Sequence, residues 1–420
     1  MDHKLLEVLA SKVNIDRVQE RISLLAEQAR DPRGGVTRLA FSTKEARAME
    51  TVAVWMEEAG LTVAYDGLGS MFGSTDGNRQ HTVVVMAGSH LDTVPNGGPL
   101  DGVLGVVGAI EGVEAVRAAD IPLARPMEVV VWRCEEAARF GQGRLGSLYF
   151  TGELSLDTIR SWERSDLPLS RLLEQVAQRP QRASGRALGG YLELHIEQGR
   201  RLEDGGRTIG AVTAIPGATR WRIEVVGRAD HSGAAPMGMR RDALAAAAEL
   251  VLAVEQAGMA ECAEESVATA VAIRAMPGAW NVVPGRVELQ TDIRGIDQVS
   301  IDRALAFVRE AARAISTRRG VEIRFEDVTR GKPVQLDESL VGLVEATARA
   351  LGYPVARIPS GAGHDAQTIA AHAPAGMVFV PSVGGISHSP EEATSPADIL
   401  AGVRVLTCAW ATLATRSARD

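Results

Sequence analysis

Short, uniformly apolar segments alternate with helical ones in the first half of the chain, and this alternation is the strongest constraint on its fold. The segments 83–90 (VVVMAGSH), 127–134 (MEVVVWRC) and 191–196 (YLELHI) are β-rich and apolar, as buried strands are. Between the first two, apolar residues recur at helical spacing, at positions 103, 106, 107, 110, 113 and 116. Strands that alternate with helices predict an α/β layer fold with a largely parallel, buried sheet.

The pattern changes from about residue 214. The segments that follow are predicted as strand, helix, strand, strand, helix and strand, in the order 221–229, 240–258, 266–276, 285–295, 300–316 and 321–328. This β-α-β-β-α-β order is that of a ferredoxin-like unit. After residue 330 the α/β pattern resumes. We therefore predict a discontinuous α/β catalytic domain over 1–213 and 330–420, interrupted by a smaller α+β domain over 214–329.

Composition excludes several classes of protein. The chain has 420 residues, of which 45% are hydrophobic and 23% charged, as in soluble globular proteins of more than one domain. A net charge of −8 disfavours a broad phosphate-binding surface, so nucleic acid is not an expected partner. We see neither an uninterrupted apolar run of membrane-spanning length nor a secretory signal. Cys134, Cys262 and Cys408 lie far apart, which favours a reducing, cytoplasmic location without thiolate metal sites.

Histidine and acidic residues gather where the predicted strands end. His90 closes the first strand, Glu135 and Glu136 follow the second, and His195 lies at the end of the third. Each has an ordinary structural explanation by itself, since acidic residues complement helix N-termini and glycines make turns. Ligand sites in parallel sheets form at the carboxyl ends of the strands. The joint occurrence of imidazoles and carboxylates there predicts a site for Zn²⁺, Mn²⁺, Co²⁺ or Ni²⁺.

The stretch AGSHLDTVPNGGPLDGVLG (87–105) carries most of this chemistry. His90 is a candidate ligand, and Asp92 could hydrogen-bond its other ring nitrogen and fix the tautomer. Asp101 precedes the predicted helix and could bridge two cations. Adjacent glutamates point in different directions, so that one of Glu135 and Glu136 can bind metal while the other stays free as a base. A metal-bound water molecule has a lowered pKa, and when the free glutamate takes its proton it is a nucleophile at neutral pH.

Taken together and in order, several motifs resemble the metal-dependent carbamoyl-amide hydrolases: GSHLDTVPNGGPLDGVLG, EE-x-x-RF, ELHIEQG, DHSGAAPMGMRRDA, NVVPGRVELQTDIR, SGAGHDAQ and GGISHSPEE. This family contains N-carbamoyl-L-amino-acid hydrolase, allantoate amidohydrolase and β-ureidopropionase, and it is related to aminoacylases and carboxypeptidase G type peptidases. The resemblance extends over nearly the whole chain. It implies a zinc-exopeptidase-like α/β catalytic domain with an inserted ferredoxin-like lid and dimerisation domain.

The resemblance also implies roles for individual residues. The implied ligands are His90, Asp101 and His195 for one divalent ion and Asp101, Glu136 and His388 for a second. Glu135 corresponds to the general base, and Asp92 to a carboxylate that supports the ligands. His195 stands where the peptidase relatives carry a carboxylate, which is a mark of the carbamoylase branch.

Substrate contacts are implied in both predicted domains. The corresponding positions are Gln198, His231, Asn281, Arg294, Ser360, Gly361 and Gly363. His231 matches a residue that stabilises the oxyanion from the partner subunit of a homodimer. Arg294 suits a substrate carboxylate, because a planar guanidinium can donate two parallel hydrogen bonds to it. Ser70 and Ser74 depart from the usual Asn and Arg of the family, which puts local loop contacts in doubt more than the chemistry.

We therefore predict a homodimeric, dinuclear metal amidohydrolase that cleaves the carbamoyl C–N bond of an N-carbamoyl-L-amino acid to the amino acid, CO₂ and ammonia. Allantoate hydrolysis would use the same residues and stays an alternative, as does an N-acyl amino-acid hydrolase. A non-catalytic binding protein on this scaffold is disfavoured because every implied ligand and the base are present. We find neither G-x-G-x-x-G at a strand-to-helix turn nor G-x-S-x-G, which disfavours dinucleotide binding and serine hydrolysis.

Overall fold

The computed structural model describes residues 1–163, 167–262 and 265–416. The chain divides into two compact units, one formed by Met1–Thr213 with Leu336–Asp420 and the other by Ala214–Gln335. The inserted unit therefore extends six residues beyond the predicted boundary at 329. The reason is that the short strand β14 (Val334–Gln335) pairs with β7 (Ala214–Ile215).

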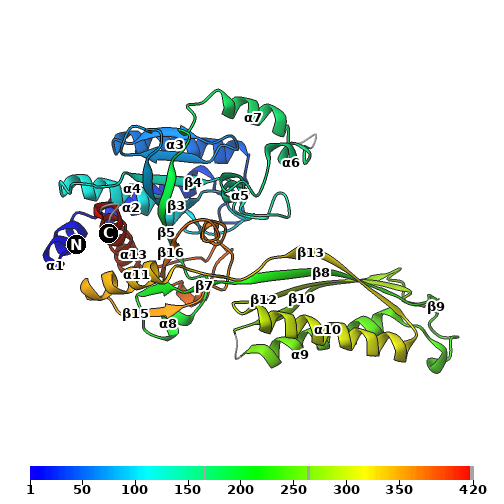
Figure 1. Ribbon diagram of the computed structural model, residues 1–420. Helices are drawn as coiled ribbons and strands as arrows, with labels where there is room; N and C mark the ends of the chain where they lie inside the picture. Colours follow the sequence, from blue (N-terminus) through cyan, green and yellow to red (C-terminus); the bar gives the residue numbers. More distant parts are fainter. Residues whose placement is uncertain (164–166, 263–264, 417–420) are drawn as a thin grey trace. The chain divides into compact units, whose positions relative to one another are not determined.

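The first unit is built on a mixed sheet, with eight strands in the described part of the chain (Figure 1). Their order is β1-β2-β4-β3-β5-β16-β6-β15. The strands are β1 (Thr62–Tyr65), β2 (Met71–Ser74), β3 (Val83–His90), β4 (Met127–Trp132), β5 (Ala187–Ile196), β6 (Ile209–Val212), β15 (Val355–Ile358) and β16 (Ala375–Val380). The neighbours β4, β3, β5 and β16 run parallel, whereas β1, β2 and β6 each join antiparallel neighbours. The predicted parallel sheet is thus correct for the centre and for the edge pair β6 and β15, which is also parallel.

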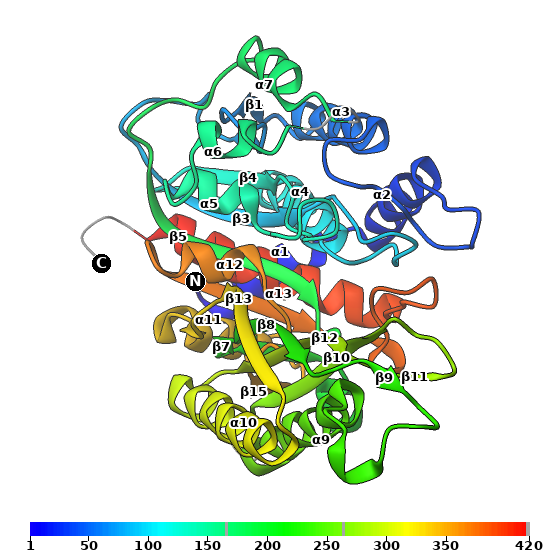
Figure 2. The same cartoon turned by 90° about the vertical axis from the view of Figure 1, so that its right-hand side faces the viewer.

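Helices cover this sheet and explain its apolar strands. The helices of the first unit are α1 (His3–Ser11), α2 (Ile15–Gln28), α3 (Thr43–Glu58), α4 (Val103–Ala118), α5 (Leu145–Phe150), α6 (Leu156–Arg160), α7 (Leu169–Ala177), α8 (Arg201–Asp204), α11 (Glu338–Ala350), α12 (Asp365–Ile369) and α13 (Pro396–Thr415). Helix α13 packs on α4, β5 and β16 (Figure 2). Strands β3 and β4 are buried along nearly their whole length, as expected for strands covered on both faces.

The second unit contains a four-stranded antiparallel sheet in the order β10-β12-β8-β13. Its strands are β8 (Gly217–Val226), β10 (Val267–Met276), β12 (Arg286–Gly295) and β13 (Glu322–Arg330), and its helices are α9 (Ala243–Glu261) and α10 (Gln298–Arg319). Buried Trp221, Ile223 and Val225 alternate with more exposed residues along β8, because only one sheet face packs against the helices (Figure 1). This confirms the predicted ferredoxin-like unit.

Helices α9 and α13 are long and apolar enough to cross a membrane by length and composition alone. Packing accounts for this character in α13, whereas α9 keeps part of its apolar surface exposed, including Leu252 and Met259. Helix α13 is a core helix, with 78% of its apolar window buried. Helix α9 buries its alanine-rich face against α10 and β10. A helix that is apolar on most sides is expected wherever it is enclosed by other elements.

Candidate metal centre

The four parallel central strands bring the predicted ligands to one edge of the sheet. Strand β3 ends at His90, and β5 ends one residue after His195. Glu136 follows β4, and His388 lies in the loop after β16. Because β4, β3, β5 and β16 are consecutive neighbours in the sheet, their carboxyl ends are adjacent. Residues separated by almost 300 positions are therefore assembled in one place.

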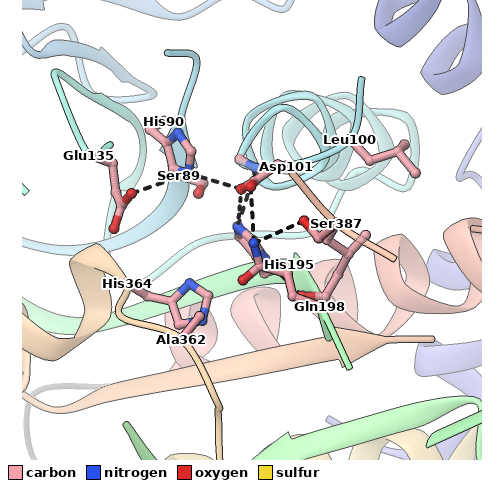
Figure 3. Close-up of polar contacts among 12 residues, drawn as sticks. Ser89, His90, Leu100, Asp101, Glu135, His195, Gln198, Ala362, His364 and Ser387 are labelled. Atoms are coloured by element: carbon pink, nitrogen blue, oxygen red, sulfur yellow. Dashed lines mark hydrogen bonds and ion pairs between the residues drawn. The ribbon is translucent and has the colours of Figure 1, made fainter. Parts of the chain in front are cut away.

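Two groups of side chains could each hold a metal ion. They are His90, Asp101 and His195, and Asp101, Glu136 and His388, with the ligand atoms of each group within 4.8 Å of one another. The Asp101 carboxylate belongs to both groups. Figure 3 shows it between His90 and His195 of the first group. Its Oδ1 lies 3.0 Å from His195 Nε2, and its Oδ2 lies 3.0 Å from His388 Nε2. This is the arrangement expected of a carboxylate that bridges two ions.

Backbone carbonyls orient two of the imidazoles. His90 Nδ1 lies 2.9 Å from the carbonyl oxygen of Asp92, and His195 Nδ1 lies 2.9 Å from that of Ile196. A carbonyl oxygen only accepts, so each Nδ1 carries a hydrogen, and each Nε2 is the ring nitrogen that faces Asp101, at 3.4 Å from His90 and 3.0 Å from His195. Imidazole nitrogens and carboxylate oxygens without thiolates fit Zn²⁺, Mn²⁺, Co²⁺ or Ni²⁺.

Asp92 supports the site differently from our expectation. Its carboxylate oxygens accept hydrogen bonds from the backbone N–H groups of Glu135 and Glu136, each at 3.0 Å. The distance from Asp92 Oδ1 to His90 Nδ1 is 3.8 Å, so the ring is oriented by the Asp92 carbonyl and not by its side chain. Asp92 therefore joins the loop after β3 to the loop after β4.

The two adjacent glutamates point to different partners. Glu136 Oε1 lies 3.3 Å from His388 Nε2. Glu135 Oε2 instead lies 4.0 Å from His90 Nε2 (Figure 3). The Glu135 side chain is 12% exposed, which leaves it accessible to a water molecule. The preceding Cys134 has a φ of 58°, a left-handed conformation that turns the chain sharply after β4. This divergence lets one glutamate be a ligand and the other a base.

The buried carboxylates and imidazoles of this site shift one another's pKa values and favour shared protons. Burial raises the pKa of the Glu135 carboxyl well above its usual value; His90 opposes this rise and the other carboxylates add to it. Hydrogen bonds to Asp101 and Glu136 raise the pKa of His388 to about 10. Burial opposes ionisation of Asp101, but hydrogen bonds from His195 and the other imidazoles hold its pKa well below its usual value. A divalent cation would replace these protons among the same groups.

Three of the non-glycine residues with a left-handed backbone lie around this site. Gln198 and His388 have left-handed φ angles of 58° and 55°, like Cys134. Each such residue costs on the order of 1–3 kcal/mol, and such strain persists only where the surroundings hold it. Gly102 has a φ of 68°, and a Cβ added there would lie 2.6 Å from ring atoms of His90. The turn before α4 therefore requires glycine at position 102.

Part of the predicted substrate site lies in the first unit. Gln198 Nε2 donates to Asp101 Oδ2 at 3.0 Å, and its Oε1 is buried without a partner among the described residues. Ser360 Oγ accepts a hydrogen bond from the N–H of Ala362. A Cβ added at Gly361 would meet no atom within 4 Å. The loop from Ser360 to Gly363 is connected to the candidate ligand His195 through His364. The His364 ring centroid lies 4.6 Å from that of His195, and His364 Nε2 lies 2.9 Å from Ser360 Oγ.

The other predicted substrate residues, His231, Asn281 and Arg294, lie in the second unit. His231 is exposed in β9 (Asp230–His231), which pairs with β11 (Val282–Val283). Its Nδ1 accepts from the N–H groups of Gly233 and Ala234, each at 3.1 Å, so Nε2 carries the hydrogen and is a donor. Arg294 makes a two-fold hydrogen bond with Asp292, at 2.7 and 2.8 Å.

Sequence reasoning assigned no role to Ser387 and Glu392. The Glu392 carboxylate accepts hydrogen bonds from the backbone of Leu100 and Asp101 and from Ser387 Oγ. The only signal for them was their place beside His388 in the GGISHSPEE motif.

Comparison with known proteins agrees with this geometry. The model of peptidase family M20/M25/M40 matches residues 86–412. The chain belongs to this family. An N-carbamoyl-L-amino acid amidohydrolase of Geobacillus stearothermophilus is 37% identical over 93% of this chain and 96% of its own length. A ureidoglycolate hydrolase of Arabidopsis thaliana is 34% identical over 96% and 88%. An allantoate amidohydrolase of Bacillus subtilis is 34% identical over 93% and 95%.

A solved structure identifies the branch of the M20 family. The amidase of the hydantoinase/carbamoylase family from Burkholderia multivorans superposes with a TM-score of 0.89 at 34% identity. The match covers 96% of this chain and 99% of that one. The chain is thus a member of the hydantoinase/carbamoylase amidase branch, and the resemblance drawn from its motifs is confirmed.

Proposed function

We propose that this protein is a dinuclear, metal-dependent amidohydrolase that cleaves the carbamoyl C–N bond of an N-carbamoyl-L-amino acid. The observation that carries the proposal is the Asp101 carboxylate shared by two imidazole and carboxylate groups, with Glu135 beside them. The Geobacillus stearothermophilus relative, an N-carbamoyl-L-amino acid amidohydrolase, supports this choice of substrate. Water adds to the carbamoyl carbon, the bond to the amino-acid nitrogen breaks, and the carbamic acid released decomposes to CO₂ and ammonia.

The residues of the first unit have separate roles in this reaction. Divalent ions held by the two groups would polarise the carbonyl and lower the pKa of a water molecule. Glu135 takes the proton of that water and passes it to the leaving nitrogen. The Glu135 carboxyl belongs to neither ligand group, so it stays free to accept and return a proton. Gln198, next to Asp101, offers its unpartnered Oε1 to an N–H of the substrate.

The second unit supplies the remaining contacts in this proposal. The Nε2 hydrogen of His231 is donated to the developing oxyanion, and Arg294 binds the substrate carboxylate. We propose that His231 acts in the active site of a partner subunit. The second unit has a surface that a second copy would cover, because β10 is an edge strand and exposed apolar side chains lie on it and on α9: Leu252, Met259, Val267, Val271 and Ile273.

A mixed dimer tests the role of His231. Glu135→Gln subunits and His231→Ala subunits are each expected to be inactive. If His231 serves the partner's active site, half of the dimers formed by equal random mixing contain one intact site. About a quarter of wild-type activity should then return, from the symmetry of the dimer. The measurement is ammonia release before and after mixing under dissociating conditions. Absence of any recovery in confirmed mixed dimers would show that His231 acts within its own subunit.

A substrate panel tests the reaction itself. We expect ammonia release to be fastest with N-carbamoyl-L-amino acids, compared with their D-enantiomers, N-carbamoyl-β-alanine, allantoate, ureidoglycolate and N-acetyl amino acids. The leading alternative is an allantoate amidohydrolase, which the Bacillus subtilis relative supports at 34% identity. A preference for allantoate would replace the proposed substrate but keep the proposed chemistry. Release of acetate from the acetyl compounds, without ammonia from any ureido compound, would contradict the proposal.

A further inference from the structure

The turn that carries Asp101 is built around one buried carboxylate. Glu392 is 4% exposed. Its Oε1 accepts hydrogen bonds from the backbone N–H groups of Leu100 and Asp101, at 2.9 and 3.1 Å. Its Oε2 accepts from Ser387 Oγ at 2.7 Å. A buried carboxylate is tolerated only where donors compensate its lost hydration, and here three donors do so.

These contacts close into a ring through Gln198. Gln198 Nε2 donates both to Ser387 Oγ, at 3.2 Å, and to Asp101 Oδ2, at 3.0 Å. The direction of each bond is determined by chemistry, because an amide NH₂ only donates and a carboxylate only accepts. Ser387 must therefore accept from Gln198 and donate to Glu392. The ring connects the loops after β3, β5 and β16, which carry Asp101, Gln198 and His388.

Packing shows that the turn fits this carboxylate closely. A Cβ added at Gly98 would overlap the carboxyl group and Cβ of Glu392. The turn 95–102 (PNGGPLDG) can therefore approach Glu392 only with glycine at position 98. His388, one residue after Ser387, is left-handed, and the Ser387–Glu392 hydrogen bond anchors the chain directly before it.

We infer that Glu392 is a positioning residue that holds Asp101 and His388 at the separation at which both bind the second metal ion. Glu392 does this from outside the ligand set, through the backbone of Asp101 and the side chain of Ser387. The inference rests on the proposed function only in requiring that a divalent ion bind between Asp101, Glu136 and His388.

Metal titration of Glu392→Gln tests the inference. Glutamine is nearly isosteric, and its Oε1 can still accept from Leu100 and Asp101. Its Nε2 would face Ser387 Oγ, which already accepts from Gln198, so the ring would contain two opposed donors. We expect affinity for the second ion to fall by about 10- to 100-fold, the usual effect of changing a group that orients a ligand. Affinity for the first ion should change much less.

The readouts do not depend on turnover. Apoprotein is titrated with Zn²⁺ against a competing chelator to obtain both affinities, and with Co²⁺ to record the visible absorption of each bound equivalent. The spectrum of the second Co²⁺ should change in Glu392→Gln. Ser387→Ala should give a similar loss, and the double variant should lose no more than the larger single loss, because both act in one ring. Glu391→Gln, the exposed neighbouring position, is the matched control.

Each outcome decides between the proposals. The inference would be overturned if folded Glu392→Gln bound both ions with wild-type affinity and gave an unchanged spectrum for the second Co²⁺. The proposed function would then still stand. Wild-type protein that binds fewer than two ions would overturn both. Glu392→Ala creates a cavity as well as removing the acceptor; if it does not fold, the glutamine and Ser387→Ala variants still decide the question.

Discussion

Glu135→Gln is expected to lower kcat by about 10²- to 10⁴-fold while both metal ions stay bound, because the loss is that of a general base. The amide keeps the size of the carboxyl but cannot accept a proton. Glu135 lies 4.0 Å from His90 and belongs to neither group of candidate ligands, so metal content should not change. KM should change little, since the carboxyl does not hold the ground-state substrate in the proposed reaction.

The adjacent glutamate provides the matched control. Glu136→Gln is the same chemical change one residue along the chain, but Glu136 lies 3.3 Å from His388 within the second candidate group. That variant should lose metal from the second site, and its activity should rise again at high metal concentration. Metal content per chain and steady-state kinetics distinguish the two variants. A Glu135→Gln protein with near-wild-type kcat would show that another group is the base.

Asp101→Asn is expected to remove both ions, with activity reduced by at least about 10³-fold through loss of the metal's charge stabilisation. The Asp101 carboxylate contacts His195 through Oδ1 and His388 through Oδ2. An asparagine has one oxygen and one NH₂ group, so it cannot offer an acceptor to both sides. Ions that bind only the folded state stabilise it, so added Zn²⁺ should raise the Tm of the wild type but not of this variant.

His388→Ala is the comparison for Asp101→Asn. His388 belongs to the second group only, so this variant should keep one ion per chain and part of the increase in Tm with Zn²⁺. Metal analysis after dialysis and thermal unfolding with and without Zn²⁺ measure both effects. Two ions per chain in Asp101→Asn would contradict a bridging role for this carboxylate.

The local pattern of apolar residues was sufficient to predict most of the strands and helices. The strand at 83–90 was predicted with the observed bounds, because its apolar run ends at the polar residue His90. The direction of the outer strands could not be read in this way. Strands β2 and β6 join antiparallel neighbours through pairings that depend on distant residues, so the prediction of a largely parallel sheet was wrong for these pairings, whereas β15 pairs parallel with β6.

The chain's own sequence determined which residues meet at the candidate metal centre. His90, Glu135, Glu136 and His195 follow apolar strands, and residues in that position meet at one edge of a parallel sheet whatever the loops between them do. Only the tertiary structure decided how these side chains are held. Asp92 binds the backbone after β4 instead of the ring of His90, and the buried Glu392 joins two ligand loops about 290 residues apart. Such hydrogen bonds depend on which donors approach in space, and no spacing along the chain encodes that.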